Sequence, residues 1–124
     1  MSRSKGRVAL VSVQPPARRE LARYLSAMGF EVEECAELAV PTAYSAVVMV
    51  ATDDAEPEAL VTQVRSWMRL TRVQRVVVVT SKPAALRDLL VANAGRLSVL
   101  AAPAFGWDVV DALRSVVQGP SRGA

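Results

Sequence analysis

Two short runs of the chain are apolar at every position. Residues 46–51 read AVVMVA, and residues 76–79 are four consecutive valines. A strand with one face in solvent alternates apolar and polar residues, whereas a strand that is covered on both faces is apolar throughout. The two runs therefore predict central strands of a parallel sheet that has helices on both faces.

Three further segments have the composition of strands. Residues 7–13 have an apolar centre and stop at residues 14–16, where two prolines cannot donate to a sheet ladder. Residues 30–35 begin with alternating apolar and acidic side chains, which predicts a strand near a sheet edge with one face in solvent. Residues 97–101 form the fifth predicted strand, and Pro103 ends it.

The segments between the strands have the periodicity of helices. Leu21, Leu25 and Met28 recur at i, i+4 and i+7, so a helix is predicted over residues 16–28, with Gly29 as its left-handed cap. Three later helices are predicted from their apolar stripes, which are Leu60, Val64, Trp67 and Met68; Leu86, Leu89 and Leu90; and Trp107, Val110, Leu113 and Val117.

Strands and helices alternate along the whole chain, with one short link. Residues 36–44 must join the second strand to the third, and nine residues are few for a parallel crossover, which usually takes about a dozen or more. Pro41 further limits any helix in this link. The order predicts an α/β fold, a three-layer sandwich around a five-stranded parallel sheet, with a shortened or missing second helix.

Length and composition bound the organisation of the chain. The 124 residues suit a single domain. We expect this domain over residues 7–118, a mobile tail over residues 1–6, and a linker or tail over residues 119–124. No apolar run reaches the ~20 residues of a membrane span, and the first residues do not resemble a signal peptide. Cys35 is the only cysteine, which excludes an internal disulfide and fits a cytoplasmic protein without membrane contact.

Charge and residue types exclude several classes of function. The net charge is +3, but the basic residues are dispersed, and no dense basic block with interleaved aromatic residues occurs. We therefore expect no direct binding of nucleic acid. The sequence contains no histidine, no glycine-rich phosphate loop and no Cys/His metal cluster. These features predict that the domain is not an enzyme and takes no cofactor.

Three pieces of the sequence have the spacing of a known family. Residues 9–15, followed by residues 29–32 (GFEV), match its first strand, first helix and second strand. Residues 76–81 look like its fourth strand with a switch hydroxyl, and residues 99–105 look like its fifth strand and the turn after it. On these pieces the chain resembles the receiver domain of bacterial response regulators, which has the flavodoxin-like fold of the chemotaxis regulator.

The resemblance implies a phosphorylation site at the carboxyl ends of the strands, and this sequence departs from the family there. Where a receiver has two acids that hold Mg²⁺, the chain has Ser12 and Val13. Val50 stands at the position of the phosphoryl acceptor aspartate, or Ala51 if the register shifts by one. Ala102 replaces the lysine that would neutralise the phosphoryl oxygens.

Two positions keep the family's residues, namely Thr80 and Pro103, whereas Val99 replaces the aromatic switch. Without the carboxylates and the lysine, a phosphoryl group would find neither a metal ion nor a counter-charge. We therefore interpret the chain as a pseudo-receiver, a regulatory module that acts without phosphorylation and without catalysis.

Two alternatives stay open. Asp53, Asp54 and Glu56 are acidic residues near the same edge of the sheet, and one aspartate could accept a phosphoryl group. Acidic residues are, however, common in the first turn of a helix, which explains them without a ligand. In the other alternative, the apolar mouth of the sheet binds a small effector.

The resemblance also implies a partner. Receivers commonly pair through the fourth helix, the fifth strand and the fifth helix, and an apolar centre with a charged surround suits a symmetric patch. In this chain that face would carry Arg87, Leu90, Val91, Arg96, Trp107, Asp111 and Arg114. Trp107 either belongs to this interface or packs in the core.

We therefore expect a homodimer that acts in bacterial signal transduction or transcription regulation. The resemblance extends to the N-terminal domain of enhancer-binding transcription activators. In such proteins an output domain follows, either an ATPase or a DNA-binding domain.

Overall fold

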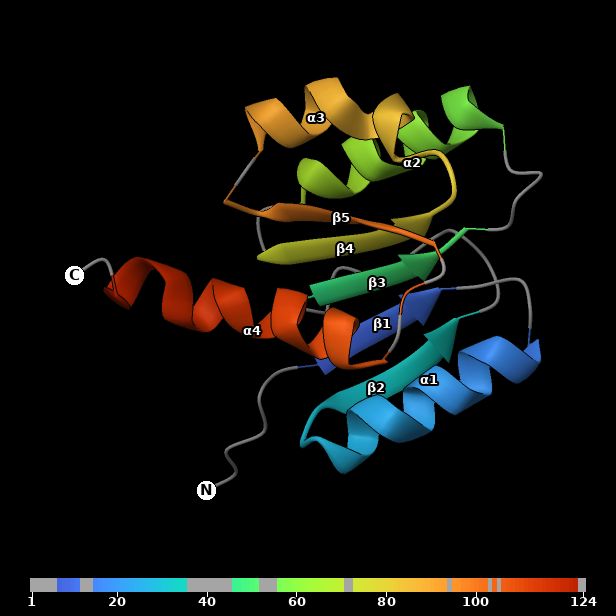
Figure 1. The fold of residues 1–124 in the computed structure, drawn as a ribbon, viewed down its shortest axis with the longest axis vertical. Helices are drawn as coiled ribbons and strands as arrows, with labels where there is room; N and C mark the ends of the chain where they lie inside the picture. The colour runs from blue at the N-terminus through green and yellow to red at the C-terminus, as the bar shows by residue number, and fades with distance from the viewer. Residues whose placement is uncertain are drawn as a thin grey trace.

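Five parallel strands form one sheet in the computed structural model, which describes residues 7–11, 15–35, 46–51, 56–70, 73–93, 95–102, 104 and 106–122. The strands are β1 (Arg7–Val11), β2 (Glu31–Cys35), β3 (Ala46–Val50), β4 (Arg75–Thr80) and β5 (Leu97–Ala101). Their order in the sheet is β2-β1-β3-β4-β5 (Figure 1). The described helices are α1 (Pro15–Ala27), α2 (Pro57–Met68), the 3₁₀ helix η1 (Pro83–Leu86), α3 (Arg87–Ala92) and α4 (Gly106–Arg122).

The predicted fold is confirmed. Helices cover both faces of the sheet: α1 and α4 lie together on one face, and α2, η1 and α3 cover the other (Figure 1). β4 is buried along its whole length, and β3 is buried up to Val50, as their unbroken apolar sequences predicted. The predicted short link, residues 36–44, lies outside the described residues, as does the tail over residues 1–6.

Each face of the sheet has its own apolar core, because successive side chains of a strand point to opposite faces. Val76 and Val78 pack toward α2, where Trp67 is only 2% exposed. Val77 and Val79 pack toward α1 and α4. Burial of each such side chain contributes roughly 1.5–3 kcal/mol before the entropic cost of folding.

A Schellman motif ends α1 at the predicted glycine. Gly29 has a φ of 101°, and its amide donates to the Ser26 carbonyl at 3.1 Å. The Phe30 amide donates to the Leu25 carbonyl at 3.2 Å, and both of these side chains are buried in one core. This arrangement satisfies two carbonyls of the last turn and requires the left-handed conformation at Gly29.

The Gly29→Ala variant is expected to lose about 1 kcal/mol of unfolding free energy, because an alanine Cβ strains the left-handed conformation. Urea denaturation followed by circular dichroism measures the loss. Gly95→Ala is the matched control, since no heavy atom lies within 4 Å of an added Cβ there and its φ is not positive. Equal stability losses in the two variants would contradict the assignment of the cap.

Two helices differ from their predicted extents. The helix predicted from Leu86, Leu89 and Leu90 begins as η1, in which the Ala85 amide donates to the Lys82 carbonyl at 3.1 Å, and becomes α-helical only at Arg87. The helix α4 continues to Arg122, through part of the segment predicted as a linker or tail.

Candidate functional site

The carboxyl ends of three strands meet at the edge of the sheet where the sequence predicted a degenerate site. Val50 ends β3 and pairs in register with Val79 of β4. The Ala51 amide donates to the Val79 carbonyl at 2.9 Å, and the Ala102 amide donates to the Thr80 carbonyl at 2.9 Å. Backbone hydrogen bonds therefore bring Val50, Thr80 and Ala102 to one edge of the sheet, as predicted.

Several of the predicted site positions lie outside the described residues, namely Ser12, Val13 and Pro103, and so do Asp53 and Asp54. Within the described part of the chain, no group of three His, Cys, Asp or Glu side chains is placed to hold a metal ion. Val50 and Ala102 carry no side-chain oxygen, so these two positions do not fit the oxygen ligands that Mg²⁺ requires.

The hydroxyl of Thr80 has a local structural role. The residue is 2% exposed, and its Oγ1 accepts a hydrogen bond from the Lys82 amide at 3.0 Å. This bond stabilises the turn between β4 and η1, as side-chain oxygens of threonine commonly do in turns. The Thr80 hydroxyl therefore has a partner within the fold itself.

Val50 faces an apolar cavity instead of a polar site. Its side chain packs against the core beneath α1 and α4 and lines a cavity of about 350 Å³. Leu21 and Tyr24 of α1, Val79 of β4, and Val109 of α4 contribute to the same lining. The position that would carry an acceptor aspartate thus belongs to a hydrophobic wall.

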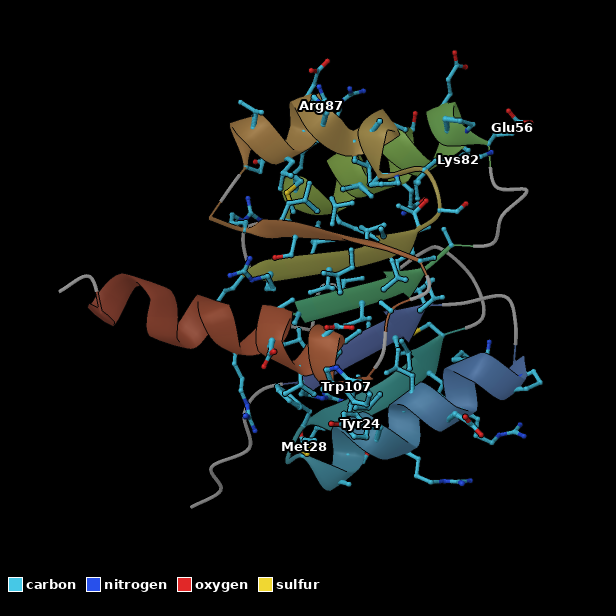
Figure 2. The ribbon with its side chains drawn as sticks, viewed as in Figure 1. Tyr24, Met28, Glu56, Lys82, Arg87 and Trp107 are labelled. Carbon is cyan, nitrogen blue, oxygen red and sulfur yellow. The ribbon has the colours of Figure 1, made fainter. Side chains whose placement is uncertain are left out.

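The helix α4 presents Trp107 to this cavity. Trp107 is 56% exposed and lines the cavity together with Tyr24 of α1 (Figure 2). The buried stripe of α4 consists of Val109, Val110 and Leu113. Val110 and Leu113 belong to the predicted stripe, whereas Trp107, which was also placed in it, lies beside the cavity, and the side chain of Val117 is outside the described residues.

Solved structures with the same architecture are response-regulator receivers. A response regulator from Desulfuromonas acetoxidans matches with a TM-score of 0.61 and 20% identity, over 90% of this chain and 96% of that chain. The signal receiver domain of NarL from Mycobacterium tuberculosis matches with a TM-score of 0.57 and 18% identity, over 98% of this chain and 100% of that chain. The fold is that of a receiver domain.

A third similar structure is a response regulator from Burkholderia pseudomallei with a phosphorylated aspartic acid, calcium ion and citrate. It matches with a TM-score of 0.62 and 15% identity, over 95% of this chain and 72% of that chain. No protein-family model and no curated protein sequence matches the chain. At these identities, the likeness to receivers concerns the fold alone.

The receiver face predicted for dimerisation is divided between two surfaces. On α3, Arg87 and Val91 are exposed, whereas Leu90 packs partly against the core. Trp107 lies across the sheet from α3, in the groove between α4 and α1 (Figure 2). Asp111 and Arg114 follow Trp107 on the same side of α4, at the i+4 and i+7 positions.

Arg96, also predicted for the dimer face, forms hydrogen bonds within the fold. Its guanidinium donates to the carbonyls of Met68 at 2.8 Å, Leu70 at 3.1 Å and Val73 at 2.6 Å. These carbonyls lie at the end of α2 and in the connection to β4, so Arg96 joins this connection to the start of β5. The sequence contains no local signal for these bonds, because the partners are 23–28 residues away.

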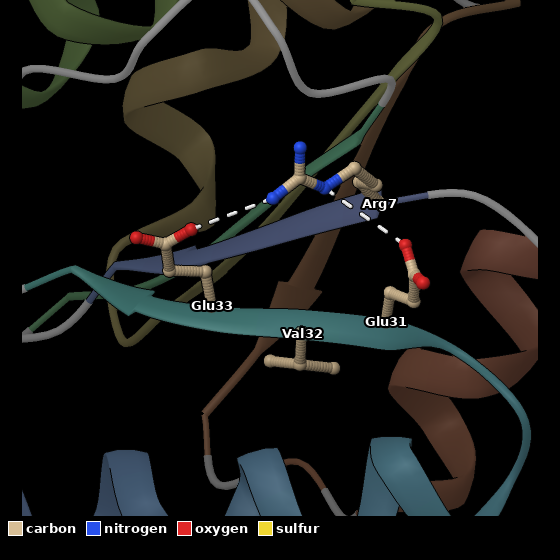
Figure 3. Close-up of a pocket in the computed structure, with 4 residues that line it drawn as sticks. All are labelled: Arg7, Glu31, Val32 and Glu33. Atoms are coloured by element: carbon tan, nitrogen blue, oxygen red, sulfur yellow. Dashed lines mark ion pairs between the residues drawn. The ribbon is translucent and has the colours of Figure 1, made fainter.

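A charged cluster lies on β1 and β2, at the opposite side of the sheet from β5. Arg7 is 3.9 Å from Glu31 and 3.8 Å from Glu33, and these residues line a hollow of about 460 Å³ (Figure 3). Val32 points to the other face of β2, toward α1 (Figure 3). Because more than half of each charged side chain is exposed, each pair contributes about 0–1 kcal/mol.

Among the described residues, two groups have perturbed pKa values: Arg75, which begins β4 at the amino ends of the strands, and Cys35, which ends β2 at the carboxyl edge. Burial lowers the pKa of Arg75, which begins β4 and donates to the Ser98 hydroxyl at 3.0 Å. Burial, and then the charge of Glu33, raise the pKa of the Cys35 thiol, and Arg18 opposes them. Catalytic sites commonly concentrate such groups. Val50, Thr80 and Ala102 have no ionisable side chain in the physiological range.

Within the described part of the chain, no helix is both long and apolar enough to cross a membrane.

Proposed function

We propose that this chain is a receiver-like regulatory module that acts through protein contacts and without phosphorylation or catalysis. The observation that carries the proposal is Val50, which stands at the carboxyl end of β3 and lines an apolar cavity. Ala102, which follows β5 and is hydrogen-bonded to the end of β4, offers no positive charge, and the Thr80 hydroxyl already accepts a hydrogen bond from a backbone amide. A phosphoryl group at this edge would lack a nucleophile, a metal ligand and a counter-charge at the described positions.

The phosphorylation test uses acetyl phosphate with Mg²⁺ and intact-mass spectrometry. We expect no mass gain of one phosphoryl group, whereas a receiver with an acceptor aspartate, treated in parallel, gains it. A gain that disappears in Asp53→Asn or Asp54→Asn would overturn the proposal and establish the alternative acceptor. The pair of variants also locates the phosphorylated residue.

For the contact surface, we propose a homodimer that forms through α3 and the outer strand β5. Val91, the fifth of the six residues of α3, is 76% exposed and could be buried at an interface. Arg87 and Asp88 are exposed on the same helix, so an apolar centre there has charged neighbours of both signs. Such a patch suits two-fold self-association, because each charge can face its opposite across the axis.

Analytical ultracentrifugation of the wild type and Val91→Arg tests the dimer. We expect the dissociation constant to rise at least tenfold in Val91→Arg, since a buried unpaired charge opposes association. Ala59→Arg, at an exposed position of α2, is the matched control and should leave the constant unchanged. A wild type that stays monomeric at high concentration would contradict the dimer. Leu90 is a poorer probe, because it also packs against the core.

The wider role that we propose is regulation of signal transduction or transcription in the bacterial cytoplasm. The receiver fold and the position of Val50 support a regulatory function, and the resemblance to enhancer-binding activators supports an ATPase or DNA-binding domain as the output. The module would pass its signal to that domain by a change in self-association.

A further inference from the structure

The open cavity between α1 and α4 has a volume in the range of small-molecule sites. Its volume is about 350 Å³, within the range of roughly 300–1,000 Å³ that is usual for ligand pockets. Three valines form apolar walls from three elements, namely Val50 of β3, Val79 of β4 and Val109 of α4. Leu21 of α1 adds a fourth aliphatic side chain. These walls would bury the apolar body of a ligand.

Two aromatic side chains border the same cavity. The ring of Tyr24 lies directly against Gly106, where an added Cβ would be 2.5 Å from the Tyr24 Cδ2 atom. The close approach holds the Tyr24 ring against the start of α4. Trp107 follows Gly106 and remains 56% exposed beside the cavity (Figure 2). Tyrosine and tryptophan rings in this position favour a flat ligand that can stack on them.

The charged residue at the cavity favours a ligand of opposite charge. Glu20 is the charged residue among the described lining residues, and no lysine or arginine is among them. Within the described part of the chain, Glu20 takes part in no ion pair. A carboxylate attracts a cation by direct charge, and aromatic side chains that line the same cavity can add to this attraction through the quadrupoles of their rings. An anionic ligand would be repelled by Glu20 and would find no lysine or arginine among the described lining residues.

We propose that this cavity binds a small flat molecule that carries a positively charged amine. Its ring would stack on Tyr24 and Trp107 above the valine walls, and its amine would face Glu20. Because Val50 forms one wall, the ligand would contact the strand end at which receivers carry the phosphoryl acceptor. Binding of the ligand would thus be a signal that the module can detect. This inference goes beyond the proposed contact function, and it does not depend on whether the homodimer forms.

The test compares two probes of similar size and opposite charge, 2-phenylethylamine and 3-phenylpropionate. The chain has two tryptophans, so a ¹H–¹⁵N spectrum of the wild-type protein contains two indole signals. The amine should shift the Trp107 signal saturably, with a dissociation constant on the order of 0.1–1 mM for a fragment of this size. The Trp67 signal, from a side chain 2% exposed, should stay in place. The carboxylate should bind at least tenfold more weakly.

Matched variants separate the site from general charge effects. Glu20→Gln should weaken amine binding at least fivefold, whereas Glu58→Gln, at an exposed glutamate of α2, should leave it unchanged. Leu21→Trp should weaken both probes by filling the cavity. The backbone signals of each variant report whether its fold is intact.

Three results would overturn the site: no shift of Trp107 at 10 mM amine, equal affinity for the two probes, or equal losses in Glu20→Gln and Glu58→Gln. None of these depends on acetyl phosphate or on the dissociation constant of the dimer. A failure here is therefore distinguishable from a failure of the contact function.

Discussion

Replacement of Arg96 by alanine is expected to lower the free energy of unfolding by about 3 kcal/mol. The guanidinium donates to three carbonyls, those of Met68, Leu70 and Val73, at 2.6–3.1 Å. Hydrogen bonds from a charged donor contribute roughly 1.5–3 kcal/mol each, and partly buried carbonyls without a donor incur a desolvation penalty. Urea denaturation should show a lower midpoint at an unchanged slope.

Two variants control for this effect. Arg96→Lys keeps the charge but has no planar fork that reaches three carbonyls, so its loss should be intermediate. Arg69→Ala removes an exposed arginine at the end of α2 and should change stability by no more than about 0.5 kcal/mol. If Arg96→Ala were as stable as Arg69→Ala and only dimerisation weakened, Arg96 would act at an interface instead of in the fold.

The Gly106→Ala variant is expected to lose about 2 kcal/mol, although alanine is the better helix former. A Cβ at residue 106 would be 2.5 Å from Cδ2 and 2.9 Å from Cε2 of Tyr24, so the ring must leave its place against α4. In a Tyr24→Ala background this conflict is absent. There, Gly106→Ala should be neutral or stabilise by up to about 1 kcal/mol.

A double-mutant cycle of the two positions measures the coupling from four thermal or urea denaturation curves. The expected sign reversal identifies the contact between Tyr24 and residue 106 as the cause. The same loss in both backgrounds would instead attribute the effect to the start of α4 itself. The cycle also reports whether the aromatic wall of the cavity depends on the glycine.

Most of the fold was predictable because the strands differ in composition according to their place in the sheet. The valine run of β4 has no polar position and lies buried on both faces, whereas β2 has exposed glutamates and lies at an edge. Gly29 could be identified as a cap because it directly follows the apolar stripe of the predicted helix. In the structure it adopts the positive φ that glycine tolerates. Such signals are local, and a single sequence contains them.

The features that escaped prediction depend on how distant segments meet. Arg96 was assigned to a surface, because nothing near it in the chain indicates three carbonyl partners around residue 70. Periodicity placed Trp107 with Val110 and Leu113 in the buried stripe of its helix, but Trp107 is 56% exposed and lies beside the cavity. Val50 was found at its strand end as predicted, whereas the cavity that it lines exists only where the two helices meet.

The acidic outer strand has a consequence for aggregation. In the described sheet, β2 is terminal and carries Glu31, Glu33 and Glu34 within five residues, and Arg7 of the neighbouring strand is already paired with two of them. A second β2 that added to this edge would bring like charges face to face, which disfavours continuous sheets and fibres. The charges of β2 therefore disfavour growth of the sheet through this side, and the other terminal strand of the described sheet is β5.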